Sequence, residues 1–473
     1  MARIKKYLHY GIYLFAFLLP FQVQLILRRG ELAGSDWQYG TIGLYVTDIV
    51  LVGVLILFGF YYFKNKEWSR EKRVRISIFW WLLSGLDVFA FISIFLAPDH
   101  VLAVYRYAVF LLALGAALVV IKVPVKRVKL VYFFALGMLF HALLGIGQFL
   151  GQYAPGFKYL GLAEHNPKKL GVSVVETIGM DGIPRRWLRA YGGLDHPNVL
   201  GGALVVAILL LVGFWAARRF YYKKDFAKWD EAARRKVKLQ ERRQAGNYAL
   251  VLVMAVGLFF SFSRGGWLAL VAGAAVLIIG YLISKRGAQA KRVGKILGLT
   301  LILVGILSFS YSSIVATRLS GETRLEKKST HQRMESFREA KQLIRENPVF
   351  GVGIGNYTAA LQEKYPDRRS WSYQPVHNTF LLVATEIGII GMLFLVALLG
   401  YLLIESFRQR NILNLAILTS LVIMLMLDHW WWSLHFGMLF QGFVWGILFN
   451  NLEKSKIKNS KLKAQNLKLK ITT

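Results

Sequence analysis

Residues 197–217 read PNVLGGALVVAILLLVGFWAA and contain no charged side chain. An apolar stretch of about 20 residues is long enough to cross a lipid bilayer as an α-helix. Eleven further segments follow the same pattern, so we expect an all-α polytopic membrane protein with about 12 transmembrane helices. The twelve predicted helices cover 7–27, 43–63, 76–97, 102–121, 130–151, 197–217, 248–262, 266–283, 297–317, 378–402, 411–427 and 434–451.

The composition of the whole chain agrees with this class. The 473 residues are 55% hydrophobic and 18% charged, and the mean hydropathy is +0.44. A soluble globule of this composition would expose too much apolar surface. The net charge of +33 does not indicate a nucleic-acid partner, because the basic residues cluster between the apolar segments. The absence of cysteine excludes disulfides, thiolate metal sites and cysteine nucleophiles.

The distribution of Lys and Arg predicts the orientation of the chain in the membrane. Short loops rich in these residues stay cytoplasmic, and the loops at 98–101 and 428–433 contain none. We therefore expect both termini in the cytoplasm and the hydrophilic insertions 152–196 and 318–377 on the exoplasmic face. The second insertion is the large loop between spans nine and ten. Residues 1–451 form a single transmembrane domain, and 452–473 form a basic, low-complexity cytoplasmic tail.

An arginine at the turn between two predicted spans is the first candidate for function. Arg264 lies in LFFSFSRGGWLAL, between the seventh and eighth spans. Ionisable residues beside membrane spans are rare and often functional. The glycines after Arg264 allow a tight turn and the approach of a ligand. The alternative is an arginine that only marks the membrane interface.

The large loop contains a predicted amphipathic helix over 331–346, with sequence HQRMESFREAKQLIRE. Ser329 or Thr330 is the expected N-cap, and Pro348 ends the helix. An apolar face is formed by Met334, Phe337, Ala340 and Ile344. Arg333 lies one turn before Phe337, so a helix packed on the bundle would direct Arg333 inward.

Two further candidates lie where the outer segments enter spans ten and twelve. His377, in PVHNTFLLVATEIGIIG, is an imidazole that can accept a proton near neutral pH. Glu386 lies deeper in the same helix and ranks below it. Asp428, in MLDHWWWSLHFG, can orient an arginine or histidine. The three tryptophans after it fit an interfacial aromatic belt.

The first outer insertion ends in RAYGGLDHPNVLGGAL, which leads into the sixth span. This position places Arg189, His196 and Asn198 at the outer membrane interface. Pro197 and Asn198 also fit the start of a helix. No metal site is expected, because the histidines are scattered in the sequence and His-Glu-x-x-His is absent. No nucleotide-binding loop or other cofactor motif is present.

The predicted outer face combines several arginines with one well-placed histidine and few acidic residues. This combination suggests that it binds a phosphate-containing substrate and transfers a proton. Arginine binds phosphate groups bidentately and stays charged. A diphosphate attached to a lipid would reach such a site from the bilayer, and a neutral histidine beside it would take a proton from an incoming hydroxyl. This reaction requires neither ATP nor metal, because arginine stabilises the charge of the leaving diphosphate.

Five motifs in this order resemble the O-antigen ligase and O-antigen polymerase-type family. They are RAYGGLDHPN, FSFSRGGWLAL, HQRMESFREAKQLIRENPVFGVGIGNY, VHNTFLLVATEIGIIG and LDHWWW, which together cover about 185–435. The resemblance implies a GT-C-like fold in the bacterial inner membrane. It also implies metal-independent transfer of a glycan from undecaprenyl diphosphate to an acceptor hydroxyl on the exoplasmic side.

The resemblance also implies roles for individual residues. Arg264 and Arg333 would bind the diphosphate, and Arg189 would be a further phosphate or glycan contact. His377 would be the general base of an inverting transfer, and Asp428 would support the site. The acceptor hydroxyl belongs to a glycan, a lipid or a protein, and the sequence does not choose among them.

Two other functions use the same residues differently. A transporter or flippase of an anionic lipid-linked sugar would use the arginines as a pathway and would need no base. A non-catalytic scaffold for polysaccharide assembly would tolerate the loss of His377 and Arg264. The polar residues gather near one membrane face rather than at the midplane, which favours the enzyme.

Overall fold

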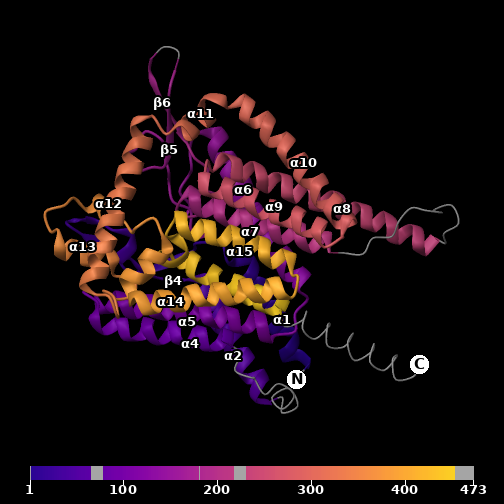
Figure 1. Cartoon of the computed structure of the whole chain (residues 1–473), viewed down its shortest axis with the longest axis horizontal. Helices are drawn as coiled ribbons and strands as arrows, with labels where there is room; N and C mark the ends of the chain where they lie inside the picture. Colours follow the sequence, from indigo (N-terminus) through magenta and orange to yellow (C-terminus); the bar gives the residue numbers. More distant parts are fainter. Residues whose placement is uncertain (1, 65–77, 180–181, 218–230, 453–473) are drawn as a thin grey trace.

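The computed structural model describes residues 2–64, 78–179, 182–217 and 231–452, and helices dominate it (Figure 1). Eight described helices are long and apolar enough to cross a membrane, which confirms the polytopic class. The predicted tail at 452–473 lies outside the described residues from 453 onward. The eight helices are α2 (Val46–Lys64), α4 with its 3-10 extension η2 (Ile78–Leu96), α5 (His100–Lys122), α6 (Arg127–Gly151), α7 (Pro197–Ala216), α9 (Arg264–Ile283), α10 (Gly287–Ser310) and α14 (Thr379–Arg408).

The four remaining predicted spans are also helical. The apolar part of α8 covers only Gln244–Phe260, and α15 has 16 residues, so both are shorter than a full span. The total of twelve transmembrane helices therefore stays a prediction. These four helices are α1 (Ala2–Leu18), α8 (Glu231–Phe260), α15 (Ile412–Leu427) and a helix over 435–452.

Several predicted spans have different bounds in the structure, among them the first and the ninth. The first was expected over 7–27, but α1 ends at Leu18 and the chain continues into a strand. The ninth was expected over 297–317, but α10 begins ten residues earlier and ends at Ser310. Its first turns contain Lys291, Arg292 and Lys295, whose long side chains let a helix continue beyond the apolar core.

The all-α prediction is wrong for the outer segments, where the described residues form three antiparallel two-stranded ribbons. β1 and β4 lie at the ends of the predicted spans 7–27 and 43–63, and the other four strands lie between apolar segments. The backbone groups of each pair bond to each other instead of forming a helix. The ribbon β5–β6 projects from the bundle (Figure 1). The pairs are β1 (Gln24–Arg28) with β4 (Ile42–Tyr45), β2 (Glu31–Leu32) with β3 (Ser35–Asp36), and β5 (Val174–Ile178) with β6 (Pro184–Leu188).

Helix α7 forms the centre of one half of the bundle. It is apolar on all sides, as expected of a helix surrounded by other helices, and nearly all of its residues are buried. It packs against α6, α8, α9 and α15. The backbone at Gly201 approaches the α8–α9 turn so closely that a Cβ there would lie 2.8 Å from the Cβ of Ser263. This contact fixes the start of α9, and with it Arg264.

The large outer loop is mostly helical. The predicted helix at 331–346 exists, but it starts at Arg324, so Ser329 and Thr330 lie inside it and are not caps. The predicted apolar face is wrong at Met334, which is 55% exposed; the buried side includes Ser336, Ala340 and Leu343. The elements of the loop are α11 (Ser312–Ser320), α12 (Arg324–Glu346), α13 (Tyr357–Lys364) and the 3-10 turn η5 (Ser370–Ser372).

The middle of this loop, at residues 348–353, is anchored in a break of α14. Gly388 has φ 81° and interrupts the helix. The backbone groups beside the break bond to the loop: Val352 N donates to Thr385 O (2.8 Å), Gly353 N to Glu386 O (2.9 Å), and Ile389 N to Pro348 O (2.8 Å). A Cβ at residue 388 would lie 1.9 Å from Val349 O, so only glycine fits there. The break thus holds the loop against the bundle.

Candidate active site

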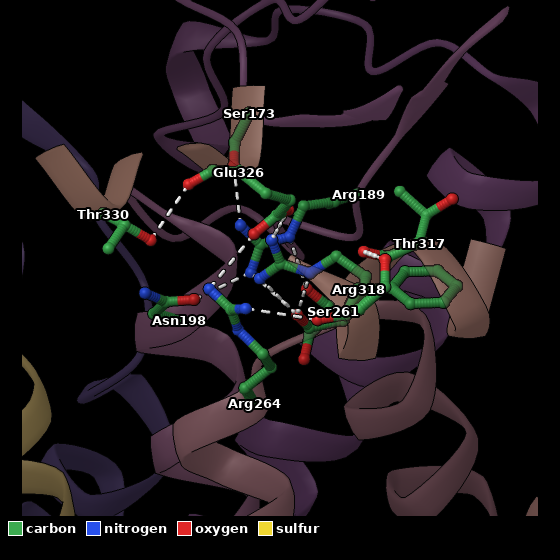
Figure 2. A network of polar contacts seen from close by, with 11 residues as sticks. Ser173, Arg189, Asn198, Ser261, Arg264, Thr317, Arg318, Glu326 and Thr330 are labelled. Atoms are coloured by element: carbon green, nitrogen blue, oxygen red, sulfur yellow. Dashed lines mark hydrogen bonds and ion pairs between the residues drawn. The ribbon is translucent and has the colours of Figure 1, made fainter. Parts of the chain in front are cut away.

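Loops that join the helices, and that are far apart in sequence, lie together at one end of the helix bundle (Figure 1). They form two neighbouring groups of polar side chains. The first, which we call the arginine cluster, consists of Arg189, Arg264, Arg318 and Glu326 (Figure 2). The second, the histidine cluster, consists of His377, Asp428 and His429.

Arg189 enters the arginine cluster from the segment between β6 and α7 and is 4% exposed. Its Nε donates to Ser261 O (2.8 Å), Nη1 to Ser173 Oγ (2.8 Å), and Nη2 to Asn198 Oδ1 (2.7 Å). All three guanidinium nitrogens therefore have acceptors inside the protein. Arg189 holds the α8–α9 turn, and its predicted contact with a phosphate or glycan stays a prediction.

Arg264 and Arg318 share the carboxylate of Glu326 (Figure 2). Nη2 of Arg264 lies 3.1 Å from Glu326 Oε2, and Nη1 of Arg318 pairs with Oε1. Nη2 and Nε of Arg318 also donate to Phe262 O at 3.0 and 3.2 Å. The Glu326 carboxylate is 5% exposed, whereas the Arg264 side chain is 37% exposed. A carboxylate between two guanidinium groups shows that this position accepts an anion.

Arg318 and Glu326 were not among the residues selected from the sequence. Both lie in ATRLSGETRLE, directly after the ninth predicted span. The signal that selected Arg264, a charged side chain next to an apolar span, applies equally to Arg318. Glu326 carried no such signal, because it lies outside the helix expected at 331–346.

Arg333 lies on α12 two turns after Glu326, on the same side of the helix. Its Nε is buried and has no hydrogen-bond partner among the described residues. Burial lowers the pKa of Arg318, and the charge of Arg333 adds to that lowering. Burial also lowers the pKa of His429 to about 3; the charge of Asp428 opposes this shift, and those of His377 and Arg333 add smaller contributions to it. Arg333 therefore acts electrostatically on both clusters.

His377 and Asp428 meet where α14 begins and α15 ends. Nδ1 of His377 lies 3.5 Å from Oδ1 of Asp428. Oδ1 also accepts from the backbone N–H of His429 (2.8 Å), and Thr379 Oγ1 donates to Asp428 O (2.8 Å). Burial alone would raise the pKa of Asp428, but its contact with His377 lowers that pKa well below its ordinary value. Asp428 is therefore a carboxylate at neutral pH.

Asn198 connects the two clusters. Its Oδ1 accepts from Arg189, and its Nδ2 donates to Asp428 Oδ2 at 2.7 Å. The side chain that caps α7 is that of His196, whose Nδ1 accepts from the backbone N–H of Asn198 (3.1 Å). The side chain of Asn198 therefore does not cap the helix. It fixes the orientation of the Asp428 carboxylate instead.

The fold brings together histidines that are scattered in the sequence. One potential ligand atom from each of His377, Asp428 and His429 lies within 4.8 Å of the others. Two imidazoles and a carboxylate are a donor set that zinc accepts. Nδ1 of His429 is 2.7 Å from Ser433 Oγ. The absence of a metal requirement stays a prediction.

Two other predicted features have structural roles. Glu386 is buried and accepts hydrogen bonds from Gly355 N (2.7 Å) and Trp432 Nε1 (2.8 Å), so it ties the large loop to α16 (Trp430–Ser433). The expected aromatic belt at 430–432 is wrong, because all three tryptophans are buried among helices rather than facing lipid.

Fold and site together define a polytopic membrane protein with a polar centre of arginines, histidines and buried carboxylates at one end of its bundle. Residues 249–396 match a family model described as O-antigen ligase. The chain is also 29% identical to an O-antigen ligase of Salmonella typhimurium over 182 residues, which cover 35% of this chain and 42% of that protein. These matches confirm the resemblance to the O-antigen ligase family. The chain thus aligns with less than half of the length of this curated relative. The family match includes Arg264, Arg333 and His377.

Proposed function

We propose that this protein is a membrane glycosyltransferase of the O-antigen ligase type. It transfers a glycan from an undecaprenyl diphosphate donor to an acceptor hydroxyl on the exoplasmic side of a bacterial inner membrane. The observation that carries the proposal is the placement of a reachable histidine, paired with a buried carboxylate, beside arginines that already hold an anion. The family match over 249–396 supports the same reaction class.

Arg264 and Arg333 bind the donor diphosphate in this proposal. Arg264 is the most exposed arginine of its cluster, and the guanidinium Nε of Arg333 lacks a partner among the described residues. A diphosphate offers oxygens for both side chains at once. Arg189 and Arg318 stabilise the same region through backbone carbonyls of the α8–α9 turn.

His377 acts as the general base. Its Nδ1 lies 3.5 Å from Asp428 Oδ1 and makes no hydrogen bond among the described residues, so Asp428 can approach it as the ring becomes charged. The other ring nitrogen, Nε2, is the one that we assign to the acceptor. Nε2 takes the proton of the acceptor hydroxyl while the oxygen attacks the anomeric carbon. The bond from that carbon to the diphosphate breaks, and the leaving group departs with the electron pair, stabilised by the arginines. Asp428 stabilises the imidazolium that forms, as a carboxylate partner does in other catalytic pairs.

Attack opposite the leaving group inverts the anomeric configuration. The test uses purified protein in liposomes, an undecaprenyl diphosphate-linked oligosaccharide of known anomeric configuration and candidate acceptors, with and without EDTA. We expect undecaprenyl diphosphate release in both conditions and a product of inverted configuration by NMR. A retained configuration would contradict direct displacement, and loss of release in EDTA would assign a metal to the histidine cluster. Movement of the donor across the bilayer without release would favour a transporter.

A further inference from the structure

A groove of about 720 Å³ runs between α6 and α8, away from both polar clusters. The two helices pack side by side (Figure 1). Apolar side chains form most of its wall, among them Leu139, Leu143, Leu250 and Val253. Leu143 is 53% exposed, as is expected of a surface that contacts the hydrocarbon of a bilayer. The groove therefore lies open to lipid rather than inside the bundle.

One end of the groove is polar and has hydrogen-bond donors without acceptors. Asn247 is only 6% exposed, and its Nδ2 has no partner among the described residues. Its Oδ1 accepts from Tyr132 Oη, which fixes the amide so that Nδ2 is the group left over. Lys129 lines the same end and makes no ion pair within the described part of the chain. A buried donor without an acceptor costs free energy, so such a group indicates a missing partner.

We propose that this groove binds one anionic phospholipid. An acyl chain lies along the apolar wall, and the phosphate accepts from Asn247 Nδ2 and pairs with the Lys129 ammonium. Charge decides the occupant, because residues 122–129, at this end of α6, contain four basic side chains and no acidic one. Basic residues at the end of a membrane helix attract anionic headgroups. The polyprenyl tail of the proposed donor would use the apolar wall but would leave both donors unsatisfied.

The structure offers a substitution that blocks the groove without disturbing the core. Gly246 lines the groove, and a Cβ added there would meet no atom within 4 Å. Gly246→Phe therefore fills the space with an aromatic ring. Gly59 on α2 also has open space at its Cβ, so Gly59→Phe is the matched control for adding an exposed ring to a membrane helix.

The experiment measures lipid retention by native mass spectrometry of the full chain, released from micelles with equal amounts of phosphatidylglycerol and phosphatidylcholine. We expect one retained phosphatidylglycerol in the wild type and in Gly59→Phe, and none in Gly246→Phe. Lys129→Gln removes one charge, which lowers the preference for phosphatidylglycerol about fivefold. Asn247→Leu lowers retention of both lipids.

Two results would overturn the proposal. One is wild-type retention of phosphatidylglycerol by Gly246→Phe. The other is displacement of the retained lipid by undecaprenyl diphosphate, which would make the groove a site for the polyprenyl chain. The experiment measures the mass of the protein with its bound lipid and not the rate of glycan transfer. Its outcome therefore does not depend on the glycosyltransferase activity proposed above.

Discussion

The imidazole of His377 lies 3.5 Å from the carboxylate of Asp428, although 50 residues of chain separate the two positions. The start of α14 supplies the first and the end of α15 the second, and Thr379 Oγ1 bonds to the backbone of Asp428 to join these ends. Asn198 holds the other carboxylate oxygen. The pair is therefore oriented by three elements, as expected of a base that works in one geometry.

Arg333 provides a direct test of diphosphate binding. Arg333→Ala should weaken donor binding by about 10- to 100-fold, since a hydrogen bond to a charged group contributes about 1.5–3 kcal/mol. The measurement is a binding titration with an undecaprenyl diphosphate-linked glycan. Arg338→Ala, at an exposed position of the same helix, is the control. An unchanged dissociation constant for Arg333→Ala would show that Arg333 does not bind the diphosphate.

Glu326 pairs with Arg264, the arginine that we expect a donor phosphate oxygen to bind, so the two anions would compete for it. Glu326→Gln keeps the shape of the side chain and removes its charge. Donor affinity should rise several-fold, while the unfolding temperature falls, because Arg318 is buried and loses its counter-ion. Titration and thermal unfolding of the same sample measure both effects. Weaker donor binding by a Glu326→Gln protein that unfolds at the wild-type temperature would show that Glu326 supports the site rather than competing with the donor.

Asn198→Ala leaves both Arg189 Nη2 and Asp428 Oδ2 without their amide partner. Each buried group then loses a hydrogen bond, so we expect a loss of stability of about 1–3 kcal/mol. Turnover should fall more than donor affinity, because Asp428 is no longer held toward His377. The measurement compares kcat with the donor dissociation constant. Equal losses in both would assign Asn198 to packing alone.

The sequence predicted the membrane helices well, because long uncharged segments such as 197–217 have one stable arrangement in a bilayer. It also selected Arg264, Arg333 and His377 as candidates, because their polarity stands out beside apolar spans, and their roles stay predictions. It did not predict the three small ribbons, whose strands are short and lie beside or within apolar segments. It also did not predict the break at Gly388, which depends on the backbone of residues 348–353 in the large loop. The same applies to the histidine cluster, since 51 residues lie between His377 and its neighbour His429.

The buried histidines predict a pH dependence of stability. Burial lowers the pKa of His429 to about 3, whereas an unfolded histidine titrates near 6.5. Between these values the unfolded state binds more protons, so the free energy of unfolding rises with pH, by at most about 1.4 kcal/mol per pH unit for this group. His196, whose pKa is also lowered by burial and by Arg189, acts in the same direction.

Thermal unfolding from pH 4 to pH 7 checks this dependence. His429→Asn should flatten the rise of the unfolding temperature with pH, because the titrating group is gone. His331→Asn, on the exposed face of α12, should leave the slope as in the wild type. Equal slopes in all three proteins would mean that His429 does not carry the effect.

The central claim is that His377 removes the proton of the acceptor. The most direct test follows undecaprenyl diphosphate release by wild type and His377→Ala in liposomes, together with donor affinity. General-base catalysis typically contributes about 10²–10⁴-fold to the rate. We therefore predict that turnover falls by that factor while the donor dissociation constant stays within about threefold of the wild-type value, a change well below 1.4 kcal/mol. Wild-type turnover in His377→Ala, or a parallel loss of donor binding, would contradict the assignment of His377 as the base.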